Sequence, residues 1–184
     1  MPIQVQFDVI SLFPSMLEGI VKESIIGRAI SNELIEVRSH DLRNWTTDKH
    51  NVADDRPFGG GPGMVLKPEP LFASIEELRG EESEVIYMAP DGEPLTRELS
   101  KELATRSHVV LISGHYEGID QRVRDQLVTR EVSIGDFVLT NGTLAAATLI
   151  DAVSRFVPGV LGEEDSLSQD SFASDRLSFP QYTR

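Results

Sequence analysis

The chain has 184 residues, 40% of them hydrophobic, which allows one sizeable core or one core with a small appendage. Its net charge of -13 argues against general electrostatic binding to nucleic acid but does not exclude a local basic site. The sequence has no cysteine, which excludes disulfides and cysteine-type zinc sites, and it shows neither a signal peptide nor an apolar run long enough for a membrane span.

The first forty residues predict two strands with helices between them. Residues 5–13, VQFDVISLF, form an apolar, β-branched run that ends at Pro14, as expected for a buried strand. Apolar residues recur at helical spacing in residues 15–22 and 24–31. Residues 34–39 alternate Leu, Ile and Val with Glu and Arg, which predicts a strand with one solvated face.

Residues 41–67 form a long, polar and glycine-rich stretch without a sustained period. An ordered loop of this length in a compact domain is usually functional. The glycines of residues 59–63 could wrap a phosphate or a backbone segment, but no Gly-Lys-Ser/Thr follows them, so they do not form a P-loop. The alternative is a flexible loop tip.

The rest of the chain alternates between helices and short apolar strands. The strand that begins at residue 84 is expected to stop at residue 89, because Pro90-Asp91-Gly92 is a strong turn signal. Residues 163–175 are acidic and serine-rich, which predicts a linker. Strands are predicted over residues 84–89, 108–113 and 129–133, and helices over residues 68–78, 96–105, 119–128 and 143–155.

This alternation predicts an α/β domain with a mainly parallel sheet. Three predicted strands end in turn-like segments, at residues 88–90, 113–115 and 133–135. Ligands bind beyond the carboxyl ends of such strands, so free main-chain groups there would suit an adenine or an amino-acid group. Gly135 and Gly142 bracket an apolar segment and suggest a slot lined by backbone, with a buried strand between two ordinary turns as the alternative.

Several segments match one family, in the same order and nearly from end to end. They are SLFPSM (residues 11–16), DDRPFGGGPGM (54–64), SGHYEGIDQRV (113–123), SIGDFVLTNGTLAA (133–146), LIDAVSRFVPGVLG (149–162), DSF (170–172) and YTR (182–184). With these segments the chain resembles the bacterial tRNA (guanine-N1)-methyltransferases, which are knotted enzymes of the SPOUT class. Agreement over many segments is far more specific than any short motif.

The resemblance implies an α/β fold with a mainly parallel sheet flanked by helices and a deep C-terminal trefoil knot, in a homodimer. Residues 1–162 would form the knotted, cofactor-binding methyltransferase domain. Residues 163–184 would form an interdomain linker and the truncated start of a C-terminal tRNA-binding domain. The enzyme would act in the cytoplasm, on the tRNA anticodon stem-loop, and would not bind a membrane.

The resemblance also implies the reaction and the cofactor. A methyl group would pass from S-adenosylmethionine to N1 of guanosine 37, on the 3′ side of the anticodon, while a requirement for magnesium stays open because the sequence does not indicate one. Tyr116 and Phe137, two of the implied contacts, would otherwise be read as core aromatics. The cofactor would contact Tyr87, Met88, Ala89, Pro90, Gly114, Tyr116, Glu117, Ser133, Ile134, Gly135, Asp136, Phe137, Val138, Leu139, Asn141, Gly142 and Ala145.

Two residues would carry the chemistry. Guanine N1 holds a proton at neutral pH and needs a general base, a role that the resemblance assigns to Asp170. It assigns Arg155 to the negative charge that develops on O6. Without the family, Asp170 would be a solvated linker acid and Arg155 a cation favoured by a helix C-terminus. Asp54, Arg56 and Gly59 would bind the substrate, in a loop that faces the tRNA.

The chain departs from the family in two places. Asn141-Gly142-Thr143 stands where the family often has Gly-Gly-Glu, so a side chain replaces bare backbone and a carboxylate near the methyl donor is lost. The chain also stops where the family usually continues into a helical domain, as a natural short form or a truncated chain would.

Three other hypotheses deserve comparison with the enzyme. A non-catalytic knotted module that binds ligand or RNA without turnover would fit both departures. A generic nucleotide-binding α/β domain would need a phosphate fingerprint, which the sequence lacks. A metal enzyme is disfavoured because the four histidines, His40, His50, His108 and His115, are dispersed and no HExxH motif occurs.

Overall fold

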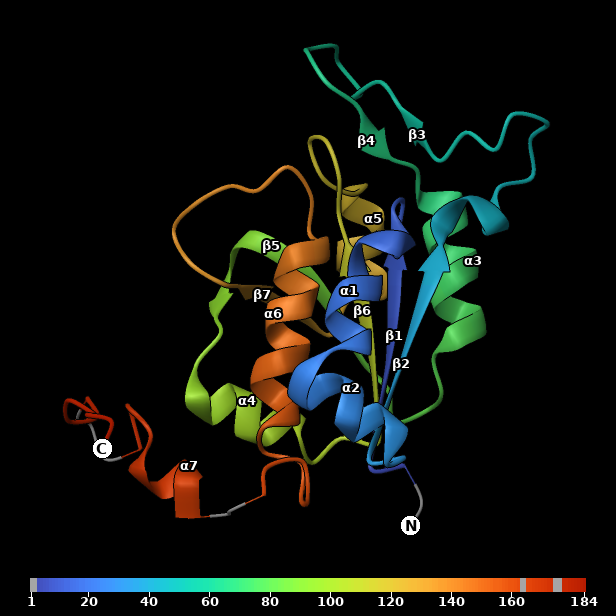
Figure 1. Ribbon diagram of the computed structural model, residues 1–184. Helices are drawn as coiled ribbons and strands as arrows, with labels where there is room; N and C mark the ends of the chain where they lie inside the picture. The colour runs from blue at the N-terminus through green and yellow to red at the C-terminus, as the bar shows by residue number, and fades with distance from the viewer. Residues whose placement is uncertain (1–2, 163–164, 174–176) are drawn as a thin grey trace.

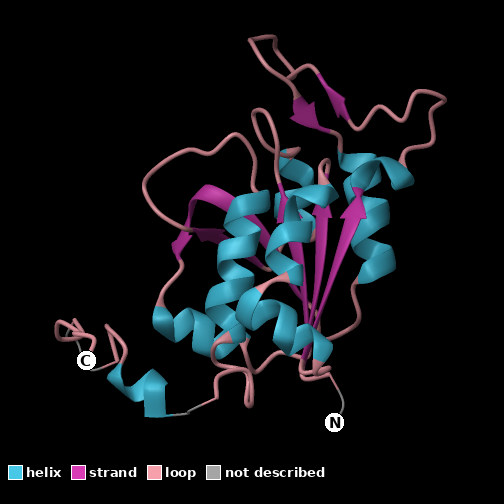
Figure 2. Cartoon of the chain, viewed as in Figure 1, coloured by secondary structure: helices cyan, strands magenta, loops and turns pink. Residues whose placement is uncertain are grey.

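A five-stranded parallel sheet forms the centre of the chain in a computed structural model that describes residues 3–162, 165–173 and 177–184. The strands lie in the order β2-β1-β6-β5-β7, and helices cover both faces (Figures 1 and 2). The prediction of an α/β domain with a mainly parallel sheet is therefore confirmed. The strands are β1 (Val5–Ser11), β2 (Ile35–Asp41), β5 (Glu84–Pro94), β6 (His108–Ser113) and β7 (Arg130–Ser133).

The helices divide between the two faces of the sheet. One face is covered by α1 (Glu18–Lys22), α2 (Ser24–Ser31), α4 (Arg97–Leu103) and α6 (Thr143–Ser154). The other face is covered by α3 (Pro68–Leu78) and α5 (Gln121–Gln126). Two 3₁₀ helices, η1 (Pro14–Leu17) and η2 (Leu42–Trp45), and the short helix α7 (Asp165–Gln169) complete the described helices.

The core consists of two clusters separated by the sheet. Successive strand residues point to opposite faces, so Phe7 and Ile86 pack toward α2 and α6 while Ile10 and Val85 pack toward α3 and α5. Both faces of the inner strands are buried, which is why these strands read as continuous apolar runs. Helices thus cover both faces of the sheet, and the carboxyl ends of its strands are left free.

A buried polar cluster interrupts the core on the face of α3. The carboxylate of Asp8 is 1% exposed. It lies 2.5 Å from Nε2 of His40 and 2.7 Å from Nε2 of His108, and it accepts a third hydrogen bond of 2.6 Å from Gln6. Nδ1 of His108 in turn lies 2.6 Å from the hydroxyl of Ser83. The cluster therefore links β1, β2 and β6 by side chains as well as by main chain.

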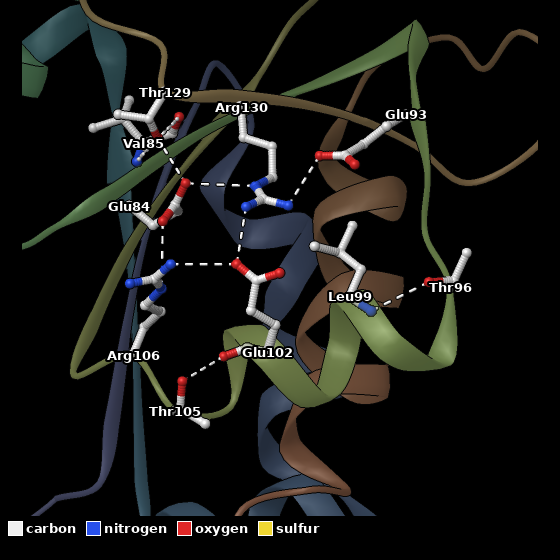
Figure 3. Close-up of polar contacts among 10 residues, drawn as sticks. All are labelled: Glu84, Val85, Glu93, Thr96, Leu99, Glu102, Thr105, Arg106, Thr129 and Arg130. Atoms are coloured by element: carbon white, nitrogen blue, oxygen red, sulfur yellow. Dashed lines mark hydrogen bonds and ion pairs between the residues drawn. The ribbon is translucent and has the colours of Figure 1, made fainter. Parts of the chain in front are cut away.

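An ion-pair network joins the outer edge of the sheet to α4 (Figure 3). Arg130 of β7 lies 3.0 Å from Glu93, 2.9 Å from Glu102 and 3.5 Å from Glu84. Arg106 reaches two of the same carboxylates, Glu84 at 3.4 Å and Glu102 at 3.2 Å. Two arginines thus tie both ends of β5 to its neighbours.

The predicted turn at Pro90-Asp91-Gly92 is wrong, because β5 continues through it to Pro94. Val132 of β7 pairs with Met88 and again with Glu93, so the intervening residues form a bulge. A Cβ on Gly92 would lie 2.6 Å from the carbonyl carbon of Glu131, which explains the glycine. Turn residues and bulge residues are the same types, and only the remote pairing with β7 distinguishes them.

Two predicted irregular segments contain regular structure. Residues 41–67 include η2, whose first turn is capped by the Asp41 side chain, and the antiparallel pair β3 (Asp54–Asp55) and β4 (Val65–Leu66). The predicted linker over residues 163–175 includes α7, although residues 163, 164, 174 and 175 lie outside the described ranges. Asp and Ser are common in linkers but also at helix starts, so composition alone did not separate these outcomes.

Candidate active site

A cavity of about 250 Å³ lies beyond the carboxyl ends of β5, β6 and β7. Its walls are residues 87–90, residues 114–118, residues 132–135 and residues 137–142, with Ala145 of α6. Every residue that the sequence predicts for the cofactor lines this cavity except Asp136. The prediction omitted four lining residues, which are direct chain neighbours of predicted ones: His115, Gly118, Val132 and Thr140.

Glycines bring the walls of the cavity close together. The N–H of Gly142 donates a 2.8 Å hydrogen bond to the carbonyl of Gly114, which joins the end of β6 to the start of α6. A Cβ on Gly142 would lie 3.1 Å from the Gly114 nitrogen, and a Cβ on Gly114 would lie 3.0 Å from the Tyr87 hydroxyl. Side chains here would fill the space that the main chain leaves open.

Residues 134–142 leave β7 and return to α6 as an open loop, not as a strand. Phe137 is 54% exposed and Val138 81%, so the alternative of a buried strand between two turns is wrong. Tyr116, across the cavity, is 50% exposed. Neither aromatic residue packs in the core, although both line the cavity. Their exposure leaves them free to contact a ligand or a second chain.

A group of hydroxyls fixes the first turn of α6 against the sheet. The Thr143 hydroxyl lies 3.0 Å from that of Ser11 and 2.8 Å from that of Ser113, and all three residues are buried. The Thr143 N–H donates a 2.9 Å hydrogen bond to Oδ1 of Asn141. Asn141 therefore satisfies a free N–H group of the helix start.

His115 stands at the rim of the cavity between two aromatic rings. Its ring centroid lies 5.2 Å from that of Phe13 and 4.1 Å from that of Tyr116. Burial lowers the pKa of His115, the charge of Asp54 opposes that shift, and the charge of Arg43 adds to it. Within the part of the chain that the structure describes, Nδ1 of His115 is buried and has no hydrogen-bond partner. The lowered pKa therefore favours the neutral form of the His115 ring.

The predicted substrate segment rests on the loop that follows β6. The N–H of Glu117 donates to the carbonyl of Met64 at 3.0 Å, and the N–H of Leu66 donates to that of Gly118 at 3.0 Å. Asp54 lies close enough to the cavity rim for its charge to act on the pKa of His115. Of the three predicted substrate residues, Asp54 thus lies at the base of this segment.

The other two predicted substrate residues lie toward the tip of the same segment. Arg56 and Gly59 do not line the cavity. They belong to the hairpin of β3 and β4. This hairpin projects from the domain beyond the carboxyl ends of β1 and β2 (Figure 1). Phe58, between them in the chain, is completely exposed.

Arg155 and Asp170 contact each other as an ion pair, and their side chains are 41% and 36% exposed. Neither lines the cavity, since Arg155 follows the last residue of α6 and the cavity adjoins its first turn. A helix of 12 residues is about 18 Å long. The structure therefore brings the two predicted catalytic residues together, at the opposite end of α6 from this chain's own cavity (Figure 1).

Over residues 3–162, 165–173 and 177–184, no three histidine or carboxylate side chains converge as they would to hold a metal ion. In those same ranges, no helix has both the length and the apolar character needed to cross a membrane.

Residues 5–184 match the family model described as tRNA (Guanine-1)-methyltransferase TrmD. A tRNA (guanine-N(1)-)-methyltransferase of Staphylococcus carnosus is 49% identical over 180 residues, which cover 97% of this chain and 74% of that protein. Proteins with the same name from Citrifermentans bemidjiense and Chloroflexus aurantiacus are each 50% identical, over 97% of this chain and 73% and 72% of their own lengths. The chain is thus similar to these relatives from three bacteria along almost its whole length.

Proposed function

The chain belongs to the tRNA (guanine-1)-methyltransferase family, and we propose that it transfers a methyl group from S-adenosylmethionine to N1 of guanosine 37, on the 3′ side of the tRNA anticodon. The observation that carries this proposal is the cavity at the carboxyl ends of β5, β6 and β7, because three strand ends and four glycines, Gly114, Gly118, Gly135 and Gly142, contribute to its walls. This is where ligands bind in open α/β sheets.

The walls of the cavity suit S-adenosylmethionine. Three strand ends offer main-chain N–H and C=O groups for an adenine and for an amino acid, and exposed faces of Tyr116 and Phe137 offer apolar contact. The proposed site also includes Asp136, an exposed residue that lies in the chain between the lining residues Gly135 and Phe137. The bound cofactor supplies an electrophilic methyl group, and the chain's own residues orient it and exclude water.

Asp170 and Arg155 match the reactive edge of guanine. N1 and O6 are neighbouring atoms on that edge, and the carboxylate and guanidinium lie side by side as an ion pair. Asp170 would accept the N1 proton as general base, and Arg155 would donate hydrogen bonds to O6 as negative charge moves there. A guanine flipped out of its stack would reach such a pair.

A site shared between two chains reconciles this pair with the cavity. Asp170 and Arg155 lie far from their own chain's cavity, so in a homodimer they would serve the cavity of the partner. Apolar side chains exposed around the cavity mouth support such an interface. They are Phe13, Met16, Tyr116, Phe137, Val138 and Leu144.

The path of residues 134–142 supports the proposed trefoil knot. The segment leaves β7 at the edge of the sheet and returns past Gly114 to begin α6 on the inner part of the fold. Residues 1–162 would then form the knotted domain, and residues 163–184 the linker and first part of a tRNA-binding domain. The hairpin that carries Asp54, Arg56 and Gly59 would face the tRNA anticodon stem-loop, in the cytoplasm.

Calorimetry and a transfer assay together test this proposal. Titration with S-adenosylmethionine should show one binding event per chain, and the protein should then methylate a tRNA transcript with guanosine at position 37. A matched transcript with adenosine at that position should accept no methyl group. Cofactor binding without transfer to either transcript would instead favour a non-catalytic knotted module, and the absence of cofactor binding would contradict the proposed site.

A further inference from the structure

A single guanidinium, that of Arg124 on α5, joins two strands that carry the walls of the cavity. Its Nε lies 2.7 Å from one oxygen of Glu131 on β7, and its Nη2 contacts the other oxygen of the same carboxylate. The same Nη2 lies 2.9 Å from Oδ2 of Asp91 on β5. The Arg124 side chain is 21% exposed. Its planar fork thus holds two carboxylates from two strands at once.

The same guanidinium also lies over the ring of Tyr87. The carbon between its nitrogens is 5.4 Å from the ring centroid. Tyr87 lines the cavity, and its hydroxyl lies near the main chain of Ile119. A Cβ on either Gly114 or Gly118 would lie 3.0 Å from that hydroxyl. The Tyr87 ring therefore packs closely against the loop that follows β6 and carries Gly114 and Gly118.

These contacts surround the bulge of β5. Tyr87 precedes Ala89 and Pro90, which line the cavity, and Asp91 follows them. Glu131 precedes Val132 and Ser133, which line the facing wall. A bulge lacks the regular main-chain pairing of a strand, so its position depends on side-chain contacts. Arg124 supplies such contacts on both sides of the segment without itself lining the cavity.

We propose that Arg124 is a positioning residue, which holds the 89–92 bulge and the Tyr87 ring in the arrangement that binds the methyl donor. This inference rests on the proposed function. Arg130 of β7 offers a comparison, because it also pairs with carboxylates of two other elements, Glu84 and Glu93 of β5 and Glu102 of α4, but none of these three partners lines the cavity (Figure 3). Arg122 offers another, since its ion pair with Asp120 is on the exposed side of the same helix.

The test compares Arg124→Gln with Arg130→Gln and Arg122→Gln. In the free proteins, amide hydrogen exchange at residues 89–92 should become at least tenfold faster in Arg124→Gln and stay within about twofold in the two controls. The dissociation constant for S-adenosylmethionine, measured by calorimetry, should rise about tenfold in Arg124→Gln alone. KM for the donor should rise with it, while kcat at saturating donor and tRNA stays the same, as expected when an interaction acts on ground-state binding.

Arg124→Lys provides a second variant, because it keeps the charge but not the fork or the stacking. Its donor affinity should lie nearer to that of Arg124→Gln than to that of the unchanged protein. Unchanged exchange at residues 89–92 in Arg124→Gln would overturn the inference, and so would an equal loss of donor affinity in Arg130→Gln with the same fall in Tm. Failure of the unchanged protein to bind the donor would contradict the proposed function, and the exchange measurement would still decide the role of Arg124.

Discussion

Replacing Asp170 with alanine is expected to lower methyl transfer to tRNA by about 10²–10⁴-fold, the contribution that a positioned general base makes. The affinity for S-adenosylmethionine should stay nearly the same, because Asp170 does not line the cavity. Stability should also change little, since the ion pair with Arg155 is partly exposed and such pairs contribute about 1 kcal/mol or less. Single-turnover transfer and calorimetry on the same preparation would measure the two effects.

Two further variants sharpen the Asp170 experiment. Asp170→Asn keeps the shape of the side chain but cannot accept the proton, so it should be as inactive as Asp170→Ala. Asp151→Ala removes an exposed carboxylate one turn before Arg155 on α6 and should retain full activity. A large loss of cofactor affinity in Asp170→Ala, or near-normal transfer by Asp170→Asn, would contradict the role of general base.

Replacing Asp8 with alanine is expected to lower the free energy of unfolding by about 3–5 kcal/mol at pH 7, as removal of one partner from a buried charged cluster does. The change leaves the donors of Gln6, His40 and His108 without their shared acceptor. Urea denaturation followed by circular dichroism would measure it. Asp151→Ala is the control, and an unchanged urea midpoint in Asp8→Ala would show that the cluster does not stabilise the sheet.

The contribution of Asp8 should depend on pH. Burial opposes ionisation of Asp8 and is the largest single influence, but hydrogen bonds from His108, His40 and Gln6 together exceed it and hold the pKa of this carboxyl well below its usual range. A carboxyl with a lowered pKa in the folded state stabilises the fold above its unfolded pKa, about 3.9, and loses that stabilisation as the pH falls further. The difference between the unchanged protein and Asp8→Asn should therefore shrink below about pH 4.

The sequence predicted the elements whose signals are local. The bounds of α2 and α3 were predicted to the residue, because apolar spacing and the Pro68 start are contained within each helix. The central strands were predicted from apolar runs, and their carboxyl ends indicated where a ligand cavity would lie. Main-chain groups at strand ends need no particular side chains, so the site could be located before its contacts were known.

The features that the sequence did not predict depend on remote pairing. Gly92 marks a bulge only because Glu131 lies against it, and Arg124 acts through residues 33 and 7 positions away in the chain. The roles proposed for Asp170 and Arg155 came from the family resemblance alone, because an acid in a serine-rich stretch and a cation after a helix are both ordinary surface residues.

The ion pairs of the arginines have a consequence for how the protein binds its RNA. Many arginines contact a carboxylate of their own chain, among them Arg38, Arg43, Arg106, Arg122, Arg124, Arg130 and Arg155. An arginine that is already paired with a carboxylate releases few of the counterions that condense along the phosphate backbone of RNA. The affinity for tRNA should therefore decline only gently as salt is added, and the anticodon loop would be selected by its shape and its bases more than by its charge.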